Sequence, residues 1–350
     1  MTDKDGVDSL MKTTRSARRA GAAPTIYDIA RLAGVNPSTV SRALTQPGRI
    51  NEKTEQRIHA AARELDYRVN PLARALPTGR TNTVGVIFSD ITNPILFDMV
   101  RGAERAASEA GYTLVIAESQ ESEEREAEAA DRVLPSVDGL VLASTRLDDD
   151  QIRGLAAKKP VVLINRHVDD VMGVLPDVDA GVEEALAHLA ELGHKIVMYL
   201  PGPATSWISR QRGRALNALA QRFGMSILEG GPGLPTLDGG RIAADTVLAS
   251  PATAVVAFND LMAIGLLRML TESGVAVPER LSIVGFDNIF GSDFTTPPLT
   301  TIRMPLELAG EQAVRALLHS VTTGEPSASG ELLPTSVIVR GSTGRAFEAT

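Results

Sequence analysis

From residue 81 onwards the chain alternates short apolar runs with stretches of helical periodicity, and this alternation constrains the possible fold more than any other feature of its 350 residues. The apolar runs lie at residues 84–88, 113–117, 139–143 and 160–165. Amphipathic stretches at 97–110 and 123–134 lie between them. Buried strands that alternate with helices favour a doubly wound α/β fold with a parallel sheet.

A second series of the same kind begins after Asp177. Its expected helices lie at residues 182–192, 210–223, 241–248 and 261–273. Its expected strands lie at residues 196–200, 254–258 and 282–286. Two such units are more than one compact hydrophobic core usually holds. We therefore expect two α/β subdomains within residues 81–350.

Residues 25–44 follow another pattern, that of two short helices separated by a turn. Apolar residues recur at helical spacing in the first helix, and Gly34 can end it in the left-handed conformation. In the second helix Asn36 can cap the backbone N–H groups, and Pro37 suits the first position. A third helix is expected from residue 51 to about residue 65. This arrangement is the helix-turn-helix pattern of DNA-binding proteins.

Polar side chains near the start of the second helix are the candidate DNA contacts. We expect Arg42 to read a base, because a guanidinium can donate two hydrogen bonds to the edge of a guanine. The other residues that we assign to the DNA interface here are Tyr27, Pro37, Ser38, Thr39 and Ser41. The alternative is an ordinary amphipathic helix pair with a solvated polar face.

Charge is unevenly divided along the chain. Residues 1–80 hold 14 Lys and Arg against 8 Asp and Glu, whereas residues 81–350 hold 21 against 35. A basic head on an acidic body is the charge distribution expected of a DNA-binding regulator. Residues 1–23 have little apolar content, so we expect a disordered arm there.

The segment from residue 66 to residue 76, taken together with the helix-turn-helix, closely resembles the LacI/GalR family of bacterial transcription regulators, and the resemblance extends to about residue 340. It implies that Asn70 opens a hinge helix that forms on operator double-stranded DNA. It also implies that Leu76 of each subunit of a homodimer wedges into the minor groove. Pro77 disfavours helical geometry at Leu76, so the hinge helix should end there. The alternative is a linker that only anchors to the next domain.

The resemblance further implies a periplasmic-binding-protein-like sensor of two α/β subdomains joined by three crossovers. We expect an arm at 1–23, a helix-turn-helix domain at 24–69, a hinge helix and linker at 70–80, and an effector-binding domain at 81–350. Within the last, one subdomain takes about 81–176 and 303–333, and the other takes about 177–302 and 334–350. The implied function is a repressor under allosteric control by a small ligand; inducer and corepressor versions both remain open.

Effector contacts are expected just after strands, where ligands bind in open α/β sheets. The assigned residues are Asp90, Phe97, Ser206, Trp207, Arg212, Asn259 and Asp287. The resemblance places Arg212, Asn259 and Asp287 among the polar effector contacts, and an arginine, an amide and a carboxylate together suit a sugar or related polyol. Each could instead have a local structural role, and Trp207 could plug a loop rather than stack on a sugar.

Other classes of protein lack their sequence signals here. No common nucleotide-binding or hydrolase motif occurs, so no enzyme is expected. The chain has no cysteine, and its five histidines lack ligand spacing, so we expect neither a metal nor another cofactor. A sugar-binding sensor or transport-type receptor without sequence-specific DNA binding is the alternative. It would need an export signal, which is not evident, so we expect a cytoplasmic protein. Without a C-terminal heptad repeat, a tetramer is not expected.

Overall fold

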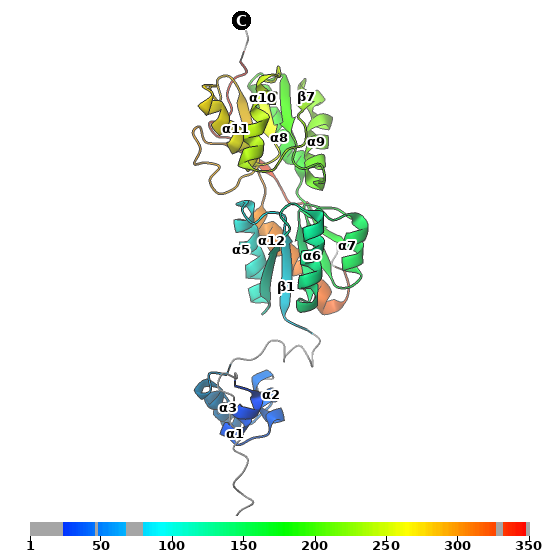
Figure 1. Ribbon diagram of the computed structural model, residues 1–350, viewed down its shortest axis with the longest axis vertical. Coiled ribbons are helices and arrows are strands. Elements are labelled where there is room, and N and C mark those ends of the chain that lie inside the picture. The colour runs from blue at the N-terminus through cyan, green and yellow to red at the C-terminus, as the bar shows by residue number, and fades with distance from the viewer. Residues whose placement is uncertain (1–23, 46–47, 68–79, 327–331, 348–350) are drawn as a thin grey trace, which may run out of the picture. The chain divides into compact units, whose positions relative to one another are not determined.

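The computed structural model describes residues 24–45, 48–67, 80–326 and 332–347. The chain divides into two compact units, residues 1–78 and 79–350, each of which has its own core (Figure 1). The predicted arm at 1–23 and the hinge residues Asn70 and Leu76 lie outside the described residues.

The first unit contains the three predicted helices. They are α1 (Ile26–Ala33), α2 (Pro37–Thr45) and α3 (Glu52–Glu64). The core is built from small and β-branched side chains that all three helices contribute, namely Ile29, Ala30, Ala33, Val40, Ala43, Ile58, Ala61 and Ala62. The predicted apolar faces are therefore the buried ones.

Local capping sets the ends of these helices. Thr25 and Asp28 form a capping box at the start of α1, with the Thr25 N–H donating to Asp28 Oδ2 over 3.0 Å. Gly34 ends α1 with a φ of 65°, in the left-handed region. The side chain of Asn51 accepts a hydrogen bond from the Lys53 N–H at the start of α3. The predicted role of Gly34 is confirmed.

The second unit begins with a five-stranded parallel sheet in the order β2-β1-β3-β4-β5. Its strands are β1 (Thr83–Phe88), β2 (Thr113–Glu118), β3 (Gly139–Ala143), β4 (Val161–Ile164) and β5 (Met172–Val174). Its helices are α5 (Ile95–Glu109), α6 (Glu123–Val133), α7 (Asp149–Ala156) and α12 (Leu306–Thr323), with a short 3-10 turn at Leu134–Ser136. Helices α5 and α12 cover one face of the sheet, and α6 and α7 cover the other (Figure 1).

A second sheet follows in the order β11-β10-β9-β8-β6-β7, parallel except for β11. Its strands are β6 (Ile196–Leu200), β7 (Ser226–Glu229), β8 (Ala254–Ala257), β9 (Ser282–Asp287), β10 (Thr300–Arg303) and β11 (Ser336–Ile338). Its helices are α8 (Val178–Glu191), α9 (Trp207–Ala220), α10 (Leu237–Leu248) and α11 (Asp260–Glu272), with a 3-10 turn at Gln221–Phe223. Helices α8 and α9 pack together, as do α10 and α11.

The chain passes between the two subdomains three times. The first passage is at Pro176, between β5 and α8, and the second lies at Met304 and Pro305, between β10 and α12. The third passage precedes β11, where Leu333 forms a parallel bridge with Pro176. The bridge is anchored by the Leu333 N–H, which donates to the Leu175 carbonyl over 2.8 Å. The passages therefore lie side by side.

Three helices of the second subdomain begin earlier than their apolar patterns predicted. Helices α8, α9 and α10 start at residues 178, 207 and 237, against the predicted 182, 210 and 241. Each is preceded by a residue whose side chain accepts from a backbone N–H three positions on: Asp177, Ser206 and Thr236. The predictions were wrong here because the first turn of each helix is defined by its cap rather than by apolar spacing.

The sequence around residue 240 is rich in glycine for a packing reason. Residues 230–240 are rich in glycine and proline, as in a loop, but Gly239 and Gly240 lie in the first turn of α10. A Cβ atom on Gly240 would lie 1.9 Å from the carbonyl oxygen of Met262 in α11. The glycines therefore let the backbones of α10 and α11 approach closely.

Candidate DNA-binding head and effector site

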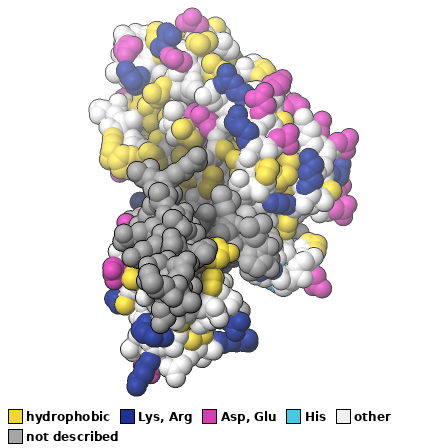
Figure 2. Space-filling view, turned by 60° about the horizontal axis from the view of Figure 1, so that its bottom comes forward, with side chains coloured by type: hydrophobic (Ala, Val, Ile, Leu, Met, Phe, Trp, Pro, Cys, Tyr) yellow, Lys and Arg dark blue, Asp and Glu magenta, His cyan; other side chains and the backbone are white. Residues whose placement is uncertain are grey.

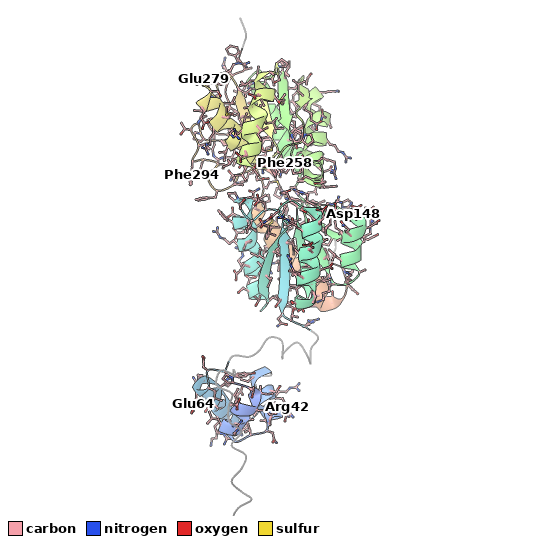
Figure 3. The ribbon with its side chains drawn as sticks, in the orientation of Figure 1. Arg42, Glu64, Asp148, Phe258, Glu279 and Phe294 are labelled. Atoms are coloured by element: carbon pink, nitrogen blue, oxygen red, sulfur yellow. The ribbon has the colours of Figure 1, made fainter. Side chains whose placement is uncertain are left out.

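Helix α2 presents a polar surface from the head. Ser38, Ser41 and Arg42 are exposed on it, while Val40 is fully buried. Arg42 lies on the outer side of the head (Figure 3). A short helix that carries small polar side chains and one arginine fits the width of the DNA major groove.

The other predicted DNA contacts of the head differ in exposure. Tyr27 in α1 is 66% exposed, which is unusual for an aromatic side chain that has a core beside it. Pro37 and Thr39 are half-buried at the start of α2. The predicted minor-groove residues Asn70 and Leu76 are outside the described part of the chain, so their role stays a prediction.

Arg212 is the centre of the candidate effector site. It lies in α9 and is only 2% exposed, which is exceptional for an arginine. One guanidinium nitrogen, Nη2, donates to Asp287 Oδ1 over 2.7 Å, and the other, Nη1, donates to the Phe258 carbonyl. The guanidinium carbon lies 3.9 Å from the centre of the Phe286 ring and 5.0 Å from that of Phe258. The charge is thus held by one carboxylate and two aromatic faces.

One N–H donor of the Arg212 guanidinium has no acceptor in the part of the chain that the structure describes. The Nε–H of Arg212 is buried and has no hydrogen-bond partner among the described residues. A buried donor without a partner costs roughly 1–3 kcal/mol, so the site gains if a ligand or water accepts from it. Arg212 and Asp287 therefore meet as the sequence predicted, and they leave hydrogen-bonding capacity unused.

The backbone at Asp287 is strained. Asp287 ends β9 with a φ of 102°, and Asn288 follows with a φ of 54°. Two consecutive non-glycine residues with positive φ are rare and concentrate at functional sites. They direct the chain away from the sheet at the carboxyl end of β9, where ligands bind in α/β folds.

Asp260 is a second buried carboxyl beside Asp287, and sequence analysis did not assign it to the site. It opens α11, is completely buried, and accepts hydrogen bonds from the Thr301 hydroxyl and the Ile289 N–H over 2.6 and 2.9 Å. Burial, and then the charge of Asp287, raise its pKa to about 8. Asp260 is therefore protonated at neutral pH.

The pKa of Asp287 is also raised by burial, while the guanidinium of Arg212 opposes that rise. Of these two carboxyl groups only Asp287 forms an ion pair with Arg212, so Asp287 is the carboxylate that balances its charge, and Asp260 is kept neutral. The signal that could have identified Asp260 is the Asn259-Asp260 pair directly after β8, of which only the first residue was chosen.

Ser206 and Asn259 both cap helices. The Ser206 hydroxyl accepts from the Ser209 N–H at the start of α9. The Asn259 side chain accepts from the Met262 N–H over 2.9 Å and donates to the Pro235 carbonyl over 2.9 Å. The local structural role that we considered for Asn259 is thus present, and contact of either residue with an effector stays a prediction.

The remaining predicted effector residues are Trp207, Asp90 and Phe97. Trp207 opens α9 and packs half-buried against the core. Asp90 accepts from the N–H and hydroxyl of Thr92, which forms a local turn. Phe97 is 51% exposed, and its ring lies 6.3 Å from that of Phe290. Among the described residues, neither Asp90 nor Phe97 bonds to Arg212 or Asp287.

Other kinds of site are not evident in the part of the chain that the structure describes. It contains no group of three or more His, Cys, Asp or Glu side chains arranged to hold a metal ion. In the same residues no helix combines the length and the apolar character that crossing a membrane requires.

A helix-turn-helix head followed by a two-subdomain α/β sensor, with a buried arginine–aspartate pair at the strand ends, defines the class of ligand-controlled DNA-binding regulators. Residues 25–70 match the family described as bacterial regulatory proteins, lacI family, and residues 186–343 match the periplasmic binding protein-like domain. The chain belongs to the LacI family: it is a DNA-binding transcriptional regulator under the control of a small ligand.

Similar proteins support this assignment over the whole chain. The HTH-type transcriptional repressor CytR of Escherichia coli (strain K12) is 31% identical over 335 residues, which cover 93% of this chain and 98% of CytR. The Lac repressor dimer bound to operator and the anti-inducer ONPF superposes with a TM-score of 0.83 at 28% identity, covering 92% of this chain and 100% of that chain. A LacI family regulator from Enterococcus faecalis with bound ribose superposes with a TM-score of 0.67 at 29% identity, covering 75% of this chain and 98% of that chain. The relatives named here are regulators, not enzymes.

Proposed function

We propose that this chain is a homodimeric repressor that binds a near-palindromic operator and changes its operator affinity when a sugar occupies the space beside Arg212 and Asp287. The observation that carries the proposal is the buried Arg212–Asp287 pair with its unpartnered Nε–H at the carboxyl ends of the strands. As a repressor it would act in the cytoplasm, where the DNA is.

A sugar suits the chemistry of this site. Each ring hydroxyl both donates and accepts, so adjacent hydroxyls can accept from Arg212 and donate to Asp287. The ring of Phe258, which keeps some exposed surface, supplies an apolar face for a sugar, whereas the fully buried Phe286 ring packs against the guanidinium and holds it in place. Phe258 lies at the edge of the second subdomain that faces the first (Figure 3). The ribose-bound relative makes ribose the first compound to test.

DNA binding is assigned to the exposed face of α2 and to the hinge. We assign base recognition to Arg42 and positioning contacts to Tyr27, Ser38 and Ser41 on the same head. Insertion of Leu76 from each subunit at the operator centre would place the two heads symmetrically. A change in the arrangement of the subdomains can then shift operator affinity, with a coupling of typically about 1–3 kcal/mol.

Exposed apolar side chains provide a surface for the second subunit. Figure 2 shows hydrophobic side chains gathered on the left of the view. Phe290 and Phe294 are 68% and 69% exposed, and their rings stack edge to face with centres 5.1 Å apart. Phe97 lies beside Phe290, and Ile91, Leu237 and Ile242 are further exposed apolar side chains of this unit. Exposed apolar groups of this kind commonly mark protein interfaces, so we assign them to the homodimer.

The test combines operator selection with ligand titration. Full-length protein is used to select a binding site from random double-stranded DNA, and its affinity for the winning site is then measured with and without ribose and other sugars. We expect a palindrome, and a change of at least about tenfold in operator affinity with one sugar, since about 1.4 kcal/mol is within the usual coupling range. The direction of the change distinguishes an inducer from a corepressor.

Arg212→Gln tests the site itself. Because loss of the buried pair also lowers stability, the variant is measured at a temperature at which thermal unfolding shows it to be folded. Under those conditions the sugar response should disappear, while operator affinity without sugar stays within about twofold of wild type. A normal sugar response in the variant would remove Arg212 from the site. Failure to select any palindrome would contradict the repressor assignment.

A further inference from the structure

Helix α9 carries an unusual charge distribution. Its fourteen residues include three arginines, Arg210, Arg212 and Arg214, all in the first eight positions, and no Asp or Glu. The amino end of a helix has a partial positive charge, so a cation in the first turn, such as Arg210, is placed unfavourably, and this effect fades beyond that turn. Helices α6, α7 and α11, by contrast, have acidic residues in their first turns. The fold alone gives no reason for this reversal.

Two of these arginines have no counter-charge. Arg212 is balanced by Asp287, whereas Arg210 donates only to the Ala204 carbonyl over 2.8 Å. Arg210 and Arg214 are exposed, and neither forms an ion pair with any residue that the structure describes. Arg222, just beyond the far end of α9, does pair with Glu183 over 2.8 Å. The uncompensated charge is therefore confined to the amino-terminal half of the helix.

An open cavity of about 800 Å³ lies against these side chains. Arg210, Arg214 and Asn217 line it from α9, spaced four and three residues apart and thus on one side of the helix. The loop after β6 and the single acidic residue Glu229 complete its wall. Arg212 is two positions from both Arg210 and Arg214, roughly 200° around the helix, so this cavity is distinct from the Arg212–Asp287 site.

Positive charge also reaches this place from the first subdomain. The charges of Arg166, Arg214 and Arg146 act on Arg210 and, together with burial, lower its pKa. Arg166 follows β4, and its side chain is 11% exposed and pairs with Asp149. Arg146 follows β3 and pairs with Glu121. Both first-subdomain arginines are therefore already paired, and the uncompensated positive charge at this place is that of Arg210 and Arg214.

We propose that Arg210 and Arg214 form an anion-binding site on α9, separate from the sugar site, which takes a phosphate group in the cavity that these two side chains line. Guanidinium groups suit phosphate because their planar N–H donors match its oxygen atoms in pairs. The phosphate belongs to a small molecule that binds in this cavity, and competition with ribose tests whether the same molecule also occupies the sugar site.

The test is calorimetric titration of the full-length protein at constant ionic strength with inorganic phosphate, ribose and ribose 5-phosphate. The variant is Arg210→Gln with Arg214→Gln, and the matched control is Arg222→Gln on the same subdomain. We expect the double variant to lower the affinity for inorganic phosphate and for ribose 5-phosphate at least about tenfold, or about 1.4 kcal/mol, and to leave ribose binding unchanged. The control should change none of the three affinities.

Two further measurements distinguish specific phosphate binding by Arg210 and Arg214 from general attraction to a positively charged surface. Because the second pKa of a phosphate ester is about 6, binding through the dianion should weaken between pH 7.5 and pH 5.5. If ribose and ribose 5-phosphate compete, the phosphate belongs to the sugar ligand; if both bind together, it belongs to a separate molecule. Equal phosphate affinity in wild type and the double variant, or equal weakening by Arg222→Gln, would overturn the proposal. The sugar response of the operator complex is measured separately, so a failure here leaves the proposed function intact.

Discussion

Replacing Arg212 with Gln should destabilise the sensor strongly, because it leaves the carboxyl group of Asp287 buried without its counter-charge. The two side chains are 2% and 3% exposed and their N–O distance is 2.7 Å. Removal of one partner from a buried ion pair typically costs about 3–5 kcal/mol, whereas an exposed pair contributes about 0–1 kcal/mol. Arg222→Gln, which breaks the exposed pair with Glu183, is the matched control in the same subdomain.

The loss should depend on pH. Burial raises the pKa of Asp287 above its ordinary 3.8, and the variant lacks the arginine that opposes this rise. The folded variant then keeps the proton on Asp287 while the unfolded chain ionises, so its free energy of unfolding falls as the pH rises above 3.8 and through the higher folded pKa. We expect a larger difference from wild type at pH 8 than at pH 5. Asp287→Asn leaves a permanently charged arginine instead, so its loss should not follow this titration.

Urea unfolding of full-length wild type, both site variants and the control, at several pH values, measures these quantities. A loss for Arg212→Gln no larger than that for Arg222→Gln would refute the argument that burial makes this pair sensitive. A large loss that is the same at pH 5 and pH 8 would refute the assignment of its cause to Asp287.

Three other predictions follow from the described contacts. Arg42→Ala should cost about 1–3 kcal/mol of discrimination at one base pair of the operator, measured with single-base operator variants, and a uniform loss on all sequences would contradict base reading. In the wild type, the folded state keeps the proton on Asp260 while the unfolded chain loses it, so the free energy of unfolding should decline as the pH rises from 3.8 to about 8. Asp260→Asn should flatten this decline, as urea unfolding at several pH values can measure, and an unchanged pH profile would contradict the assignment. Gly240→Ala should lower the free energy of unfolding by about 1–3 kcal/mol, because the new Cβ would clash with the Met262 carbonyl. Gly154→Ala in α7, where no atom lies within 4 Å of the new Cβ, should raise it by about 0.5–1 kcal/mol. Chemical unfolding measures both changes.

The parallel strands could be predicted because each is a continuous apolar run. Strand β3 is buried at every residue, and so is β8, so their sequences show no polar interruption. Strand β2 was also predicted, although it is an edge strand with mixed burial. Helices α7 and α12 and strands β5, β7, β10 and β11 were not predicted. These strands are only three or four residues long and, unlike the equally short β4 and β8, are not buried at every residue, so they lack a continuous apolar run.

The sequence predicted which residues form the candidate site better than it predicted their protonation states and hydrogen bonds. The position of Arg212 and Asp287 after strands indicated that they could meet. The sequence contains no sign that Asp260 would be protonated, because its pKa depends on complete burial and on the charge of Asp287. The caps at Ser206 and Asn259 are local, yet a side chain that caps a helix and one that binds a ligand have the same sequence preference.

Helix α12 completes the first subdomain, although more than a hundred residues of the second subdomain precede it in the chain. Gly102 in α5 and Gly310 in α12 make the contact possible, since a Cβ on either would lie within 2.0 Å of a carbonyl oxygen of the other helix. During synthesis, the face of the first sheet that α12 covers has no protection until about residue 323 has left the ribosome. The nascent chain must therefore expose apolar surface while the second subdomain is made, the condition in which chaperones bind and premature association between chains begins.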